Sequence, residues 1–205
     1  MSVAIELKGN NSVREAGNPG RIIIVRHGRP SLSRDQVLTA DEYMGWWRQY
    51  DASGLAEGER PPDRLVELAR DSHHIYSSTL RRAQETAQHL APGRDVKTDR
   101  LFVEVPLPKP PVPMMRCGPT HWGWISRTFW SLGYSPDSEG VIDAFKRANQ
   151  ASDRLIDTAT AGGNVLVCAH GFFNWMVSVT LRNKGWRPVY NDGYTYWSWR
   201  EFEKI

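Results

Sequence analysis

The sequence contains little cysteine and no long apolar run. Its two cysteines, Cys117 and Cys168, lie far apart without a metal-like spacing, which favours free thiols in a reducing compartment over a disulfide framework. The first twenty residues hold no apolar run long enough for a signal peptide or a membrane span. We therefore expect a soluble, cytoplasmic protein with no membrane partner, in which residues 1–20 form a loose extension.

The sequence also has no large excess of positive or negative charge. The 26 Lys and Arg residues nearly balance 23 Asp and Glu residues, giving a net charge of +3, and the basic residues are scattered rather than gathered in a stripe. This distribution does not indicate a nucleic-acid partner. The six histidines show no His-x-His or His-x-x-x-His spacing, so no metal site and no other cofactor is expected.

Strand-like and helix-like segments alternate along the chain. Apolar, β-branched runs predict strands at 21–25, 73–78 and 164–170, and an alternating pattern predicts a closing edge strand at 193–202. Helical patterns cover 39–50, 62–70, 79–91, 139–161 and 171–181. This order predicts one domain over residues 21–205, a three-layer α/β/α fold with a mostly parallel open sheet and a closing antiparallel edge strand.

One segment interrupts this alternation. Residues 106–119 contain six of the thirteen prolines, and a tryptophan-rich stretch follows them. Proline favours extended backbone, so two interpretations of an insertion at 106–135 remain open. It is either a rigid connector followed by a small surface helix or a lid over a cleft, in which Trp122, Trp124 and Phe129 supply apolar walls.

Three predicted strands end in positively charged or ring-nitrogen side chains. "RIIIVRHG" ends in Arg26 and His27, "SSTLRRA" brings Arg82, and "CAHG" brings His170. The carboxyl ends of parallel strands share one edge, where α/β folds bind ligands. Arginine forks suit a phosphoryl group, and histidine can act as a nucleophile or stabilise charge. We therefore expect an anion-binding site at this edge.

The segments "IIIVRHG", "SSTLRRAQETA" and "VLVCAHG" resemble, in this order, the three signatures of the histidine phosphatase superfamily, the phosphoglycerate mutase-like proteins. The resemblance implies the phosphoglycerate mutase-like fold and a metal-independent reaction. It also implies that His27 is the nucleophile, that Arg26 and Arg82 bind phosphate, and that protonated His170 completes the pocket. Glu104, in "DRLFVEVPLP" after an expected strand, would be the proton donor.

The residues after "RHG" favour the phosphatases of this family over its mutases. The continuation "RPSLS" departs from the mutase pattern, so we predict a phosphomonoesterase that hydrolyses a small phosphorylated substrate through a phosphohistidine on His27. Arg29 either adds positive charge at the pocket mouth or is solvated, and His121 and Trp122 are possible substrate contacts. A phosphotransferase or mutase using the same phosphohistidine, or a non-catalytic phospho-ligand binding protein, are the alternatives. Nothing in the sequence indicates an oligomeric state.

Overall fold

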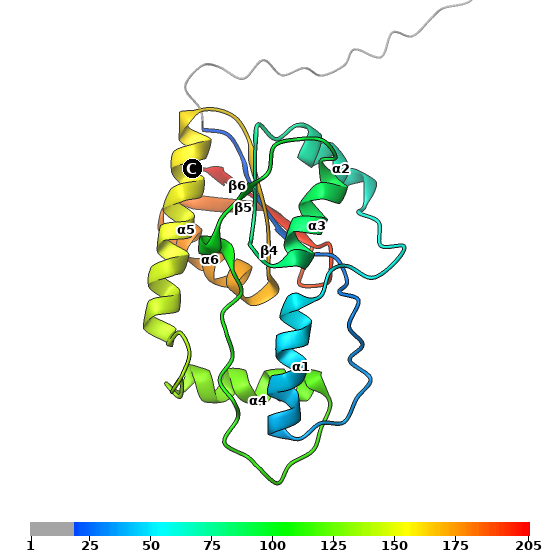
Figure 1. The fold of residues 1–205 in the computed structure, drawn as a ribbon. Helices are drawn as coiled ribbons and strands as arrows, with labels where there is room; N and C mark the ends of the chain where they lie inside the picture. Colours follow the sequence, from blue (N-terminus) through cyan, green and yellow to red (C-terminus); the bar gives the residue numbers. More distant parts are fainter. Residues whose placement is uncertain (1–18) are drawn as a thin grey trace, which may run out of the picture.

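The apolar runs of the sequence pair in one six-stranded sheet (Figure 1). The computed structural model describes residues 19–205, so residues 1–18 of the predicted extension lie outside the described residues. The spatial order is β3-β2-β4-β1-β6-β5. The strands are β1 (Ile22–Arg26), β2 (His74–Ser77), β3 (Lys97–Thr98), β4 (Val165–Ala169), β5 (Trp186–Asn191) and β6 (Trp199–Lys204).

Helices cover both faces of the sheet. They are α1 (Ala40–Ala52), α2 (Asp63–Arg70), α3 (Arg81–Leu90), α4 (Pro119–Ser131), α5 (Val141–Ala161) and α6 (Gly171–Asn183), with a short 3₁₀ helix, η1 (Arg100–Phe102). Helices α5 and α6 lie on one face and α2 and α3 on the other, which confirms the predicted three-layer fold (Figure 1). None of the helices in residues 19–205 is both long and apolar enough to span a membrane.

The register of β1 explains why its four apolar residues are all buried. The strand pairs in parallel with β4, from Ile22 opposite Val165, and antiparallel with β6. Because side chains alternate between faces, Ile22 and Ile24 pack against α5 and α6, while Ile23 and Val25 pack against α2 and α3. The parallel strands β1, β2 and β4 therefore end at one edge.

The antiparallel edge of the sheet was predicted, but it has two strands instead of one. The segment predicted as a closing strand at 193–202 forms turns up to Ser198, and β6 then lies between β1 and β5. The strands at the two edges of the sheet, β5 on this side and β3 on the other, were not predicted from the sequence. Strand β5 carries Pro188 and a bulge between Pro188 and Tyr190, both tolerated at a sheet edge.

Helices α1 and α4 pack together beyond the carboxyl ends of the strands (Figure 1). Helix α1 begins at a capping box, in which the backbone N–H of Glu42 donates to Thr39 Oγ1 at 3.3 Å and the Thr39 N–H donates to Glu42 Oε2 at 2.7 Å. Trp122 of α4 is fully buried against Tyr43 of α1. One face of α4 is thus a packing surface.

A substitution at Leu155 on α5 tests how much the buried core contributes to the free energy of unfolding. The Leu155 side chain is fully buried, whereas Ile142 on the same helix is 73% exposed. We expect Leu155→Ala to lower the free energy of unfolding by about 2–5 kcal/mol, because it removes buried methyl groups and leaves a cavity. Ile142→Ala, as the matched control, should change it by less than about 0.5 kcal/mol. Urea unfolding measures both, and equal effects would contradict the position of α5.

Candidate active site

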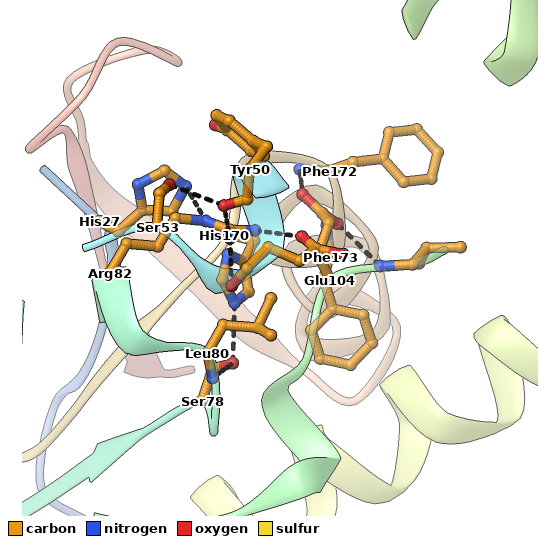
Figure 2. A network of polar contacts seen from close by, with 12 residues as sticks. His27, Tyr50, Ser53, Ser78, Leu80, Arg82, Glu104, His170, Phe172 and Phe173 are labelled. Carbon is orange, nitrogen blue, oxygen red and sulfur yellow. Dashed lines mark hydrogen bonds and ion pairs between the residues drawn. The ribbon is translucent and has the colours of Figure 1, made fainter. Parts of the chain in front are cut away.

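The structure brings together the polar side chains that follow β1, β2 and β4. The backbone N–H of His27 donates to Ala169 O at 3.0 Å, and that of Ser78 donates to Cys168 O at 2.9 Å, which aligns the three strand ends. The rings of His27 and His170 lie 5.2 Å apart, and Arg82 Nε lies 3.3 Å from His27 Nε2 (Figure 2). These side chains come from three separate parts of the chain.

His27 is buried and held in one orientation. Its Nδ1–H donates to the Gly28 carbonyl at 2.7 Å, which leaves the lone pair on Nε2 to accept from Arg82 Nε. Burial, Arg82 and Arg26 hold the pKa of His27 well below the ordinary 6.5. The imidazole is therefore neutral near pH 7. Gly28 permits this packing, since a Cβ there would lie 2.5 Å from the Trp197 ring.

His170 is fully buried beside His27. Its Nε2 lies 2.7 Å from Ser78 Oγ, while Nδ1 has no hydrogen-bond partner in the described part of the chain. Burial and the charge of Arg82 hold its pKa well below 6.5. The ring is therefore neutral near pH 7 while no anion is bound, whereas the sequence resemblance implies a protonated His170 beside bound phosphate.

The two arginines differ in how they are held. Arg82 is 1% exposed, donates to Tyr50 O at 3.0 Å and pairs with Asp51 Oδ1 at 3.1 Å. Arg26 stacks on the Tyr196 ring at 4.5 Å, and its Nε has no partner within residues 19–205. A Cβ at Gly171 would lie 3.2 Å from that Nε, so glycine leaves room for the guanidinium.

Glu104 lies at the amino-terminal end of α6. Its Oε1 accepts from the backbone N–H groups of Phe173 and Val105, both at 3.0 Å, and its Oε2 accepts from that of Phe172 at 3.3 Å (Figure 2). A carboxylate at a helix N-terminus is favoured by the helix dipole. The strand upstream of Glu104 is the two-residue β3, and η1 separates it from Glu104.

These side chains, apart from the fully buried His170, line a cavity of about 630 Å³. Arg26, His27, Arg82, Glu104 and Gly171 line one part of it. Its remaining wall comes from α1, α4, α6 and nearby loops: Arg34, Trp46, Trp47, Tyr50, Leu107, Pro119, Thr120, Gly123, Trp124, Arg127, Phe172, Trp175 and Tyr194. The second face of α4 is therefore a cavity wall.

Three residues predicted as possible substrate contacts do not line this cavity. Arg29 is exposed and pairs with Glu59 Oε1 at 3.1 Å, so a carboxylate already neutralises its charge. His121 is exposed on α4, and Trp122 faces α1 with its Nε1–H donating to Leu38 O at 2.8 Å. Phe129, expected as a wall of a lid, contacts Tyr134 instead.

Sequence reasoning missed the arginines of the wall, Arg34 and Arg127. One signal was available for the second. Thr120, Gly123, Trp124 and Arg127 recur at helical spacing, which marks a face of α4 less apolar than the face that packs on α1. Among residues 19–205 no group of three or more His, Cys, Asp or Glu side chains could hold a metal ion.

Solved structures share this fold at low sequence identity. A mycobacterial glucosyl-3-phosphoglycerate phosphatase is 20% identical, with a TM-score of 0.57 and 89% of each chain covered. A phosphoserine phosphatase from Entamoeba histolytica, solved with 3-phosphoglyceric acid, is 19% identical, with a TM-score of 0.53 and 80% of each chain covered. A protein described as mycobacterial hydrolase 2 is 22% identical, with a TM-score of 0.58, covering 90% of this chain and 82% of that one.

Among curated proteins, no sequence matches the chain. The model of one protein family does match it, and the match spans residues 22–202. That span includes all three segments on which the sequence resemblance rests, and the resemblance is thereby confirmed. The chain belongs to branch 1 of the histidine phosphatase superfamily.

Proposed function

We propose that the chain is a phosphomonoesterase that transfers the phosphoryl group of a small phosphorylated substrate to His27 and then to water. The observation that carries this proposal is the state of His27, a buried neutral imidazole whose Nε2 lone pair points at Arg82 at the end of a cavity. Membership of the superfamily supports it. So do the activities named for two proteins of the same fold, which act as phosphatases.

In the first step, His27 Nε2 attacks phosphorus in line, and the bond from phosphorus to the leaving oxygen breaks with its electron pair on oxygen. The Gly28 carbonyl, which accepts from Nδ1–H at 2.7 Å, stabilises the positive charge that develops on the ring. Arg26 and Arg82 neutralise the equatorial oxygens. Because these side chains supply the positive charge, the proposed reaction uses no metal ion.

His170 acts in this proposal as a neutral hydrogen-bond donor. If the Ser78 hydroxyl donates to Nε2, at 2.7 Å, the ring proton lies on Nδ1, the nitrogen without another partner in the described chain. That N–H is available to a phosphoryl oxygen next to His27. A dianionic phosphoryl group would also raise the pKa of His170, so binding and proton uptake are linked.

Glu104 is the acidic residue among those lining the cavity and is the proposed proton shuttle. It enters the first step as the carboxylic acid, the form that the second step regenerates, and protonates the leaving oxygen. In the second step it accepts a proton from the water that attacks phosphorus. The bond between phosphorus and Nε2 then breaks, its electron pair returns to the imidazole, and inorganic phosphate leaves.

Loss of the nucleophile gives the most direct test. His27→Ala should abolish turnover of 4-nitrophenyl phosphate while the fold persists, because the change removes the attacking nitrogen.

The phosphohistidine formed by the wild type should also be trapped. Because a phosphoramidate is lost in acid, the reaction should be quenched in base, where the phosphohistidine is stable, and the phosphoryl group should then be lost on acidification. A variant with a substantial fraction of wild-type rate, or a base-labile adduct, would contradict the mechanism.

Leaving groups of different acidity test Glu104. We expect Glu104→Gln to lower the rate of phosphoryl transfer from an alkyl phosphate by about 10²–10⁴-fold, because an alkoxide needs a proton to leave. The loss with 4-nitrophenyl phosphate should be much smaller, since 4-nitrophenolate departs without one. Single-turnover rates measure both. Equal losses on the two substrates would show that Glu104 is not the proton donor.

The neutral state of the two histidines predicts their titration. The folded pKa values lie below 6.5, so both rings should stay unprotonated as the pH falls through that value, as followed by NMR of ¹⁵N-labelled protein. Excess inorganic phosphate should move the protonation of His170 to higher pH, because an adjacent anion favours the imidazolium. Variants His27→Ala and His170→Ala assign the signals. Protonation near pH 6.5 without added anion would contradict the electrostatic description of the site.

A further inference from the structure

The cavity is far larger than a phosphoryl group requires. At about 630 Å³ it lies within the range of sites that enclose a whole small molecule. The proposed phosphoryl site occupies the end formed by Arg26, His27 and Arg82. The rest of the cavity must therefore face the leaving group of the substrate. The residues that line this part indicate which chemistry the leaving group has.

Three of the helices that form the walls of this part of the cavity contribute aromatic rings. Helix α1 contributes Trp46 and Trp47, α4 contributes Trp124, and α6 contributes Phe172 and Trp175. Trp124 is 72% exposed and Trp175 is 37% exposed, although both line the cavity. Aromatic rings presented in this way favour a flat, apolar or aromatic group that can stack between them.

Arg127 is a cation within this apolar wall, and it forms no ion pair with a carboxylate of residues 19–205. Its guanidinium lies over the Phe172 ring at 3.7 Å, and its Nη2 reaches only Val105 O, at 3.5 Å. Its Nη1 is buried with no hydrogen-bond partner among the residues that the structure describes. Arg82 and Arg147, by contrast, pair with carboxylates at 3.1 Å and 2.6 Å.

The position of Arg127 places it on the leaving-group side of the site. The ring beneath it belongs to Phe172, whose backbone N–H donates to Glu104, the proposed donor to the leaving oxygen. Burial lowers the pKa of Arg127, and the charge of Glu104 opposes this effect. The oxygens of Glu104 are hydrogen-bonded to backbone N–H groups instead of Arg127, so Nη1 keeps an unused donor on a residue that lines the cavity.

We infer that the substrate is a phosphomonoester of an aromatic or similarly flat apolar leaving group that carries a second anionic group, and that Arg127 binds this anion. The inference rests on the proposed function, because it assigns the leaving-group half of the same cavity. A guanidinium with a free edge matches a carboxylate or a phosphate. Either anion would supply the charge-assisted partner that Arg127 lacks within the described chain.

Matched aryl phosphates test the inference. The ratio of kcat/KM for 4-carboxyphenyl phosphate to that for 4-carbamoylphenyl phosphate isolates the charge, because the two leaving groups have nearly the same shape. We expect the wild type to prefer the carboxylate by about tenfold or more, as one desolvated charge-assisted pair gives. A third substrate, 4-phosphonophenyl phosphate, shows whether a phosphate-like anion is preferred to a carboxylate.

The variants assign that preference to Arg127. Arg127→Met should bring the ratio close to one, and Arg127→Lys, which keeps the charge, should retain part of it. Arg116→Met is the matched control and should keep the wild-type ratio, because Arg116 is exposed and pairs with Glu42 outside the cavity. Circular dichroism and thermal melts check that each variant is folded.

The outcomes separate this inference from the proposed function. If the wild type hydrolyses both aryl phosphates through His27 but shows no preference, or if Arg127→Met loses both activities in proportion, the inference is wrong and the phosphatase proposal stands. If the wild type hydrolyses neither aryl phosphate nor 4-nitrophenyl phosphate and forms no phosphohistidine, both are wrong.

Discussion

The burial of a charged guanidinium beside His27 is the constraint on which the arrangement of the site depends. Arg82 is 1% exposed, and a buried charge without partners would cost several kcal/mol. Its partners Tyr50 O and Asp51 belong to the last turn of α1, where carbonyl groups lack partners within the helix and the dipole is negative. Helix α1 has no basic residue of its own there, so Arg82 of α3 supplies that charge.

A second helix end has the opposite polarity. Helix α6 begins after His170, which provides no side-chain cap, and Glu104 accepts from its first N–H groups instead. Arg147 fixes the backbone before Glu104, since it donates to Val103 O at 2.7 Å and pairs with Glu139 at 2.6 Å. Arg82 and Glu104 are therefore each held at a helix terminus that favours their charge, so the positions of these two side chains are set before any ligand arrives.

The parts of this arrangement that depend on short-range patterns were predictable from the sequence. The β-branched runs of β1 and β4 identify buried strands, and parallel strand ends meet at one edge, so the proximity of His27 to His170 follows. Partners from distant segments were not predictable. Arg29 meets Glu59 thirty residues further along, and Glu104 meets the start of α6, because the tertiary fold alone brings these groups together.

Helix α4 is the clearest case in which the local sequence pattern does not predict the contacts of its side chains. Trp122 and Trp124 are two residues apart, so they point about 200° apart around the helix, and the sequence does not say which of them meets α1. The structure places Trp122 in the packing with Tyr43 and Trp124 in the cavity wall. One helix thus joins a buried cluster to the leaving-group side of the cavity, whereas the strand ends hold the phosphoryl side. A change of wall residues on the cavity face of α4 can therefore alter which leaving group fits while His27, Arg82 and His170 keep their geometry.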